Sequence, residues 1–282
     1  MTVLPVVEGD GGVDYQELLG GLKRFGSTET EICVHGLGVL PEQVHENVIV
    51  APWWEPQSMP ALGGAGEVTE LSDCAASLRA WDIVKDGMAI TYIKTGIGAP
   101  QHMDAVLSLG LTPCKRILFL GSVGALDDQI GIGDIVVPEY SVCGDGASRY
   151  LADAPLANSD VFGEKAYPDW ELLDRLKEIT ARACKAHNVR WHSGKTFSID
   201  TIFAQFAHID EILGMGCNVI EEETAAAFRA AAMMGIPMAA LFSVSDNTVA
   251  KKSLVSGRTK EEMEYRRYVR RELFPKIIFE FF

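Results

Sequence analysis

From Asn47 onward, the sequence alternates short runs of β-branched and other apolar residues with longer stretches of helical spacing. The strand candidates are residues 48–51, 89–94, 116–120, 134–137, 217–220 and 238–244. The helix candidates between them are residues 100–109, 169–187 and 224–234, each with apolar residues at helical intervals. Strands that alternate with helices build a sheet with helices on its faces. The pattern predicts an α/β fold, a single domain with a mixed, largely parallel, twisted central sheet flanked by helices.

The two ends of the chain depart from this pattern. Residues 1–46 are glycine-rich and irregular, with one amphipathic helix candidate at residues 15–25. They are predicted to form an N-terminal extension that packs on a core of residues 47–282 and covers a surface or a subunit contact. Thr259 and Glu262 have the spacing of a capping box, which predicts a helix from Lys260. A solvated or ion-paired face, and not a binding site, is predicted for the arginines of this helix. These are Arg266, Arg267, Arg270 and Arg271.

The composition narrows the class of partner. The chain has 282 residues, 48% of them hydrophobic, which suffices for one large core, and no stretch resembles a linker. A formal net charge of −14 at pH 7 opposes the binding of nucleic acid or of an anionic membrane, so a small molecule is favoured. No apolar run reaches the ~18 residues of a membrane span, and Met1 to Asp10 lacks the features of a signal peptide. A cytoplasmic protein is therefore predicted.

Neither a metal nor a cofactor is predicted. The cysteines form no C-x-x-C pair, and the histidines show no metal-ligand spacing. Free cysteine usually behaves as a small core residue, so buried, unreactive thiols are expected. The six cysteines are Cys33, Cys74, Cys114, Cys143, Cys184 and Cys217.

Four polar or glycine-rich segments follow predicted strands. In open α/β sheets, ligands bind at the carboxyl ends of the strands, so residues 95–100, 121–125, 221–224 and 245–247 are the candidate site. Gly96 and Ser122 lie in the two glycine-rich segments, whose backbone N–H groups could approach an anion or a sugar. A tight turn explains either segment taken alone at least as well.

The two acidic segments each allow two interpretations. The carboxylates of residues 221–223 precede a helix, where they complement its dipole or accept hydrogen bonds from a vicinal diol such as that of ribose. Asp246 ends the most apolar strand, where it caps the next segment or acts as a proton donor of raised pKa. Composition and spacing alone leave both alternatives open.

Six segments in order resemble the motifs of the nucleoside phosphorylase/nucleosidase superfamily. The strongest are residues 218–228, 235–238 and 243–247, where the family reads approximately V-E-M-E-(A/T)-A, G-(I/V)-P and S-D. Residues 96–100, 121–137 and 196–200 resemble further family motifs, so the resemblance covers about residues 47–250. It implies a phosphorylase/hydrolase-like fold that cleaves the N-glycosidic bond of a nucleoside, with purine or 5′-modified purine nucleosides favoured. It also implies a homo-oligomer.

The resemblance assigns the sugar and base contacts. Glu223 falls at the glutamate that holds the ribose hydroxyls, and Glu221 at the first acid of the family's E-x-E. Glu222 stands where the family has methionine beside the ribose, and it is expected to turn outward because an unpaired buried carboxylate is costly. The positions that sandwich base and sugar are Ile202, Phe203 and Ile220.

The resemblance also assigns the proton donor. Asp246 falls at the acid that protonates the purine leaving group at N7, and Ser245 assists it. Cleavage makes the ribose more positive and the base more negative, so carboxylates below the sugar and an acid at the base stabilise the transition state.

The phosphate-binding motifs of the family are absent. The G-D-P-x-R loop is replaced by residues 51–55, and Phe119 stands at the position of a second arginine. Glu55 resembles the glutamate that activates water in methylthioadenosine/S-adenosylhomocysteine nucleosidases; a surface acid is the equally weighted alternative. Hydrolysis is therefore slightly favoured. Phosphorolysis with Arg149, Lys94 or Lys195 as anion contact, and a non-catalytic nucleoside-binding protein, are the alternatives.

Overall fold

The computed structural model describes residues 13–63, 67–72, 78–255 and 257–282. Cys74 and the stretch from Met1 to Asp10, which entered the predictions on thiols and signal peptides, lie outside these residues. The other cysteines are free and buried, as predicted. No helix within the described ranges is both long and apolar enough to span a bilayer.

The described strands form one mixed sheet in the order β10-β6-β8-β9-β5-β1-β4-β3-β2, with β7 paired to β6. Their pairings are parallel within β1–β4, β1–β5, β5–β10, β6–β8 and β8–β9, and antiparallel elsewhere. The predicted mixed α/β fold is confirmed. The bounds are β1 (Asn47–Ala51), β2 (Val68–Glu70), β3 (Arg79–Lys85), β4 (Met88–Lys94), β5 (Arg116–Ala125), β6 (Ile135–Gly144), β7 (Lys165–Ala166), β8 (Trp191–Ile199), β9 (Val219–Glu221) and β10 (Met238–Asn247).

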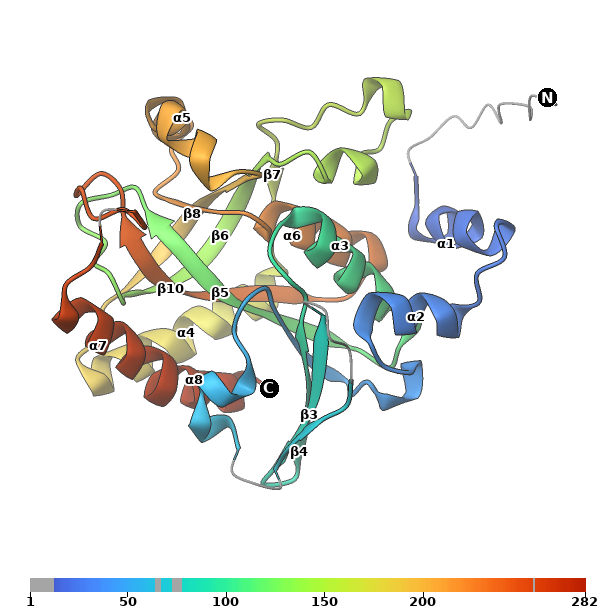
Figure 1. The fold of residues 1–282 in the computed structure, drawn as a ribbon, viewed down its shortest axis with the longest axis horizontal. Coiled ribbons are helices and arrows are strands. Elements are labelled where there is room, and N and C mark those ends of the chain that lie inside the picture. Colours follow the sequence, from blue (N-terminus) through green and yellow to red (C-terminus); the bar gives the residue numbers. More distant parts are fainter. Residues whose placement is uncertain (1–12, 64–66, 73–77, 256) are drawn as a thin grey trace.

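Part of the sheet closes on itself. Strand β10 pairs with both β6 and β5, and β5 also pairs with β9, so β5, β10, β6, β8 and β9 form a closed ring of strands. The strands β1, β4, β3 and β2 extend from β5 as an open wing. Asn247 pairs with Ala125, so β5 and β10 end side by side, at the left of Figure 1 between α5 and α7.

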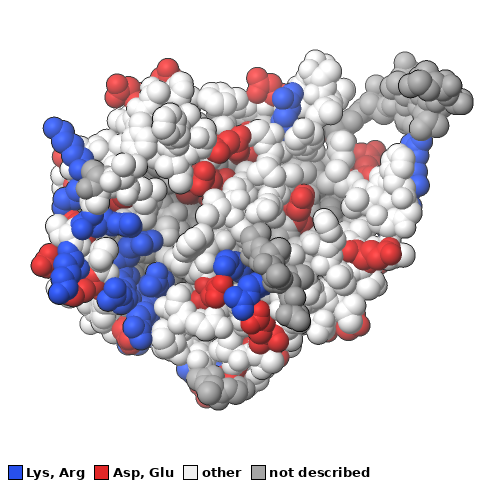
Figure 2. Space-filling view, viewed as in Figure 1, with Lys and Arg blue, Asp and Glu red and all other residues white. Residues whose placement is uncertain are grey.

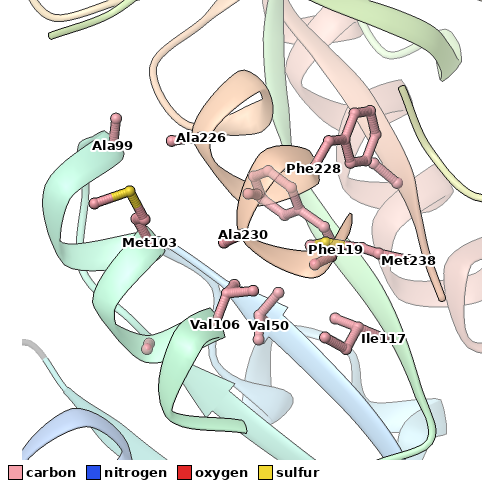
Figure 3. Close-up of a cluster of buried hydrophobic side chains, with 14 of the residues drawn as sticks. Val50, Ala99, Met103, Val106, Ile117, Phe119, Ala226, Phe228, Ala230 and Met238 are labelled. Carbon is pink, nitrogen blue, oxygen red and sulfur yellow. The ribbon is translucent and has the colours of Figure 1, made fainter. Parts of the chain in front are cut away.

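Helices cover both faces of the sheet. Strand β5 directs Ile117 and Phe119 into one apolar cluster and Leu118 and Leu120 into another, as the twofold alternation of a strand requires. The first cluster lies beneath α3 and the alanine-rich α6, whose small side chains allow close packing (Figure 3). The second lies beneath α4 and α8. The helices are α1 (Tyr15–Arg24), α2 (Glu29–Leu37), α3 (Ala99–Ser108), α4 (Trp170–His187), α5 (Ile202–Gly214), α6 (Thr224–Met234), α7 (Lys260–Tyr268) and α8 (Phe274–Phe281), with a π-helical turn, η7 (Val269–Leu273), between the last two. The 3-10 turns are η1 (Pro41–Gln43), η2 (Pro56–Ser58), η3 (Pro60–Leu62), η4 (Leu109–Leu111), η5 (Ser148–Leu151) and η6 (Leu156–Asn158).

The N-terminal segment contains two helices, α1 and α2, that lie beside α3 (Figure 1). The Tyr15 hydroxyl donates a hydrogen bond to the carbonyl oxygen of Leu107 at 2.8 Å. Cys33 and Leu37 on α2 are fully buried in the cluster beneath α3. The described part of residues 1–46 thus completes the hydrophobic core as well as covering it.

Candidate active site

A cavity of about 420 Å³ opens where β5, β9 and β10 end. Its wall combines segments that lie far apart in the chain. They are residues 52–54 after β1, Ile97, the end of β5, the turn from β9 into α6, the end of β10 with Ser245 and Asp246, and Leu254, Arg258 and Arg266. The start of α5 adds Ile202 and Gln205. The cavity therefore lies at the carboxyl ends of the strands, where the sequence placed the candidate site.

Glu221 ends β9 and caps the start of α6. Its Oε2 accepts hydrogen bonds from the backbone N–H groups of Glu223 and Thr224, both at 2.7 Å, and its Oε1 accepts one from the Ser198 hydroxyl at 2.5 Å. Burial raises the pKa of its carboxyl to about 7. These three hydrogen bonds hold the turn that presents Glu223, and Glu221 itself also lines the cavity.

Glu223 faces the same cavity. Its Oε1 accepts a hydrogen bond from the Gly98 N–H at 2.7 Å, and the φ of 99° at Gly98 is one that glycine adopts without strain. The side chain is buried, and burial together with the charge of Glu221 raises its pKa well above the usual value. Glu222 is half-buried and lines the cavity, contrary to the prediction that it turns outward. Its partial exposure keeps the carboxylate hydrated, which avoids the cost of full burial.

Asp246 enters the cavity at a β-bulge. The register of β10 against β5 shifts between Val244 and Asp246, which re-aims the side chains at the end of the strand. Asp246 is 2% exposed, and the Ser245 hydroxyl donates a hydrogen bond to its Oδ1 at 2.5 Å. Burial raises the pKa of Asp246, against the effect of that hydrogen bond. An acid of raised pKa that lines a cavity can hold a proton for transfer.

Of the predicted base and sugar contacts, Ile220 and Ile202 line the cavity but Phe203 does not. The Phe203 side chain is 94% exposed. Residues three apart share one side of a helix, so α5 directs Ile202 and Gln205 toward the cavity and Phe203 away from it. Gln205 is a lining residue that the sequence analysis missed, because α5 itself was not predicted.

The three remaining loop residues predicted to bind substrate have different outcomes. Ser122 lines the cavity, whereas Gly96 is buried and its neighbour Ile97 lines the cavity instead. Arg149 is exposed on η5 and is absent from the wall. Hydrogen bonds from the backbone and hydroxyl of Ser148 to the Asp145 carboxyl close the turn on whose surface Arg149 lies.

Glu55 is held by two cations next to the cavity wall. Its Oε1 lies 2.7 Å from Lys94 Nζ and 3.1 Å from Arg79 Nη1. The hydrogen bond from Lys94, with the charges of Lys94 and Arg79, lowers its pKa. A carboxylate of lowered pKa is a weaker base, so this environment gives no support to Glu55 as a water-activating base. The ion pair with Glu55 also occupies Lys94, which was one of the predicted anion contacts. Lys195, another of these predicted contacts, is exposed.

Two arginines that the sequence analysis did not assign to the site lie in the cavity wall. Arg258 donates from Nη1 to the Ser245 carbonyl oxygen at 3.0 Å, and Arg266 donates from Nη2 to the Ser122 hydroxyl at 2.9 Å. The prediction of a solvated arginine face is therefore wrong for Arg266, although Arg267 is exposed. The i, i+4 spacing of Arg266 and Arg270 was the available signal, since both guanidinium groups lie over the Trp54 ring, at 6.0 and 5.6 Å.

Comparisons with known proteins identify the family of the chain. A family model described as the phosphorylase superfamily matches residues 75–274. The chain is 26% identical over 211 residues to the guanosine phosphorylase of Halorubrum lacusprofundi, a match that covers 73% of this chain and 80% of that protein. It is 32% identical over 123 residues to the uridine phosphorylase of Escherichia coli, covering 44% of each protein.

Two solved structures share the fold. The uridine phosphorylase of Vibrio fischeri ES114 superposes with a TM-score of 0.65 at 22% identity, over 84% of this chain and 92% of that chain. The purine nucleoside phosphorylase of Toxoplasma gondii, in complex with immucillin-H, gives 0.66 at 19% identity, over 84% and 90%. Because the family model spans most of the chain and the fold is the same, the chain belongs to the phosphorylase superfamily and is an enzyme of the nucleoside phosphorylase type.

Proposed function

We propose that this enzyme cleaves the N-glycosidic bond of a nucleoside by phosphorolysis, releasing the free base and ribose 1-phosphate. The observation that supports the proposal is that Glu223 and Asp246, from the ends of two different strands, line one cavity. A purine nucleoside is the favoured substrate, because an acid such as Asp246 suits a leaving group that takes up a proton on its ring nitrogen.

The arrangement accounts for each step of the reaction. Glu223 accepts hydrogen bonds from the ribose hydroxyls, and its charge stabilises the positive character that the sugar ring develops. The bond between base and sugar breaks with its electron pair passing to the base, while protonated Asp246 supplies a proton to the base nitrogen. An oxygen of hydrogen phosphate forms the new bond to the anomeric carbon. The proton of that phosphate then restores Asp246, so atoms and charges balance.

Two observations favour phosphate over water as the nucleophile. The sequence slightly favoured hydrolysis because the family's two phosphate arginines are missing, and the comparisons do not support that preference, since the relatives named above are phosphorylases. The ion pairs at Glu55 also weaken the residue on which hydrolysis would depend. The homo-oligomer and the cytoplasmic location implied by the sequence stay predictions.

Product analysis tests the proposal. Guanosine, inosine, adenosine and uridine are incubated with the enzyme with and without inorganic phosphate, and the sugar product is identified by mass. We expect base release that requires phosphate and yields ribose 1-phosphate, with a purine nucleoside as the best substrate. Equal rates without phosphate, with free ribose as product, would establish hydrolysis instead. Nucleoside binding without any turnover would establish the non-catalytic alternative.

A further inference from the structure

Helix α7 places one arginine, Arg266, in the cavity wall. We propose that Arg266, with Ser122, anchors the phosphate ion, so that this enzyme holds its oxyanion from α7. This inference rests on the proposed function and names the residues of its phosphate subsite.

The hydrogen bonds of Arg266 leave donors free. Its Nη2 donates to the Ser122 hydroxyl at 2.9 Å, which orients the guanidinium toward the end of β5. Its Nε is buried without a hydrogen-bond partner, and no carboxylate of the described residues lies within ion-pair distance. A buried Nε without a hydrogen-bond partner is costly, and an anion that accepts its hydrogen bond removes that cost.

Arg266 lies near both like and opposite charges. Burial lowers its pKa to about 10, the charges of Arg258 and Arg270 act in the same direction, and the charge of Asp246 opposes them. Figure 2 shows basic side chains gathered over α7 at the left of the view, in a chain whose formal net charge is −14. Arg258 and Arg266 add basic groups to a cavity wall that also carries acids, and an anionic ligand would bind beside the arginines.

The aromatic loop after β1 supports the guanidinium. Trp54 is buried, and its ring lies 6.0 Å from the Arg266 carbon Cζ. Arginine stacked on an aromatic face loses less freedom when it binds a tetrahedral oxyanion. The resemblance to the family would place phosphate-binding arginines in this loop and at position 119, but Pro52 to Trp54 and Phe119 carry no guanidinium. Arg266 therefore supplies a guanidinium that these positions lack.

Substitution of Arg266 by methionine tests the anchor, with Arg270→Met as the matched control. Both changes remove one positive charge from the face that covers Trp54, but Arg270 is not among the residues that line the cavity. We expect Arg266→Met to raise the KM for phosphate roughly 10- to 100-fold, the loss typical of a charge-assisted contact, and to change the KM for the nucleoside less than threefold. Arg270→Met should change both constants less than threefold. An unchanged KM for phosphate in Arg266→Met, or an equal effect of Arg270→Met, overturns the inference.

Two further measurements keep the outcome interpretable. If Arg266→Met does not fold, Ser122→Ala removes only a hydroxyl, and it should raise the KM for phosphate about tenfold; no change would count against the anchor. Calorimetric titration with inorganic phosphate alone, on the wild type and Arg266→Met, separates this inference from the proposed function. Phosphate binding that is lost in Arg266→Met supports the anchor even if the enzyme hydrolyses nucleosides. Phosphate-dependent turnover that survives the substitution leaves the function intact and removes the anchor.

Discussion

Asp246 is the residue whose chemistry the structure defines most closely. Replacement by asparagine keeps the shape of the side chain and removes the transferable proton. We expect the kcat to fall by ~10²–10⁴, the usual contribution of a general acid, with an unchanged melting temperature. Since burial raises the pKa of Asp246, wild-type activity should fall as the pH rises through that pKa, and this limb of the profile should disappear in the variant. Steady-state kinetics between pH 5 and 9 measure both effects.

Ser245→Ala is the companion change. It removes the hydroxyl 2.5 Å from Asp246 Oδ1 but leaves the proton donor in place. The kcat should fall about tenfold, far less than in Asp246→Asn. A kcat of Asp246→Asn within threefold of the wild type would contradict the assignment of the acid.

Glu223 provides a prediction about stability. Because burial raises its pKa in the folded protein, its contribution to the free energy of unfolding is fully present below the unfolded pKa and is lost as the pH rises through the folded pKa. Glu223→Gln retains an oxygen that can accept the Gly98 N–H and never ionises. The variant should therefore gain stability relative to the wild type between pH 5 and pH 8, and roughly 2–4 °C of melting temperature corresponds to each 1 kcal/mol. Calorimetry at the two pH values measures the difference, and a constant difference would contradict the charged-state argument.

The cavity residues that lie at strand ends and within family motifs could be predicted from the sequence. Glu223, Asp246 and Ser122 lie in the cavity wall as predicted, because strand ends and motif order locate them. The i, i+4 spacing of Arg266 and Arg270 places both arginines on one side of α7, but whether that side reaches the cavity depends on how α7 packs against β10, which the sequence does not show. Of the two partners of Glu55, Lys94 ends the predicted strand β4, whereas Arg79 begins β3, a strand that was not predicted.

At the scale of elements, the capping box of α7 connects helix stability to the site. The Thr259 hydroxyl accepts a hydrogen bond from the Glu262 N–H at 3.2 Å, as predicted. Thr259→Ala should cost ~0.5–2 kcal/mol of helix stability and should raise the KM for phosphate, because α7 positions Arg266. Chemical denaturation and phosphate-dependent kinetics measure the two effects.

The capping box of α2 is the control. Thr28 and Glu31 at the start of α2 make the same pair of contacts, at the N-terminal side of the molecule and outside the cavity wall. Thr28→Ala should destabilise the protein to a similar degree and leave the KM for phosphate unchanged. A phosphate KM that responds equally to both substitutions would mean that general loosening, and not the placement of α7, causes the effect.

Helices whose apolar residues recur at a regular spacing were predicted well, whereas a strand without a regular apolar pattern was missed. α4 and α6 match their predicted ranges within a residue, since their apolar residues recur at helical spacing and α4 begins at an Asp169 cap. β8 was missed because polar residues interrupt it. Thr196 and Ser198 are fully buried there, and Ser198 bonds to Glu221. The local sequence does not show that a buried hydroxyl such as that of Ser198 will find a carboxylate to accept its hydrogen bond.

For the whole molecule, the fold class could be predicted but the closure of the ring could not. β5 pairs with β10, whose first residue lies more than a hundred positions later in the chain, and the pairing depends on burial that no short segment encodes. The N-terminal segment shows the same limit. A helix was predicted at residues 15–25 and α1 forms there, but α2 was not predicted, because it depends on the apolar surface that α3 offers for packing.

That packing gives a last prediction, on whether residues 13–46 belong to the cooperative core. A Cβ at Gly36 on α2 would lie 2.0 Å from the Ser108 Oγ of α3, so Gly36→Ala forces the two helices apart. Overpacking of this kind costs ~1–3 kcal/mol. Gly20 on α1 is exposed and a Cβ there meets nothing within 4 Å, so Gly20→Ala should be neutral or stabilise by up to ~1 kcal/mol through helix propensity. Urea denaturation followed by far-ultraviolet circular dichroism should show a lower midpoint for Gly36→Ala in one transition, with the phosphate KM unchanged because α2 lies outside the cavity wall. A separate early transition for the N-terminal helices, or equal midpoints for the two variants, would mean that this segment covers the core without belonging to its cooperative unit.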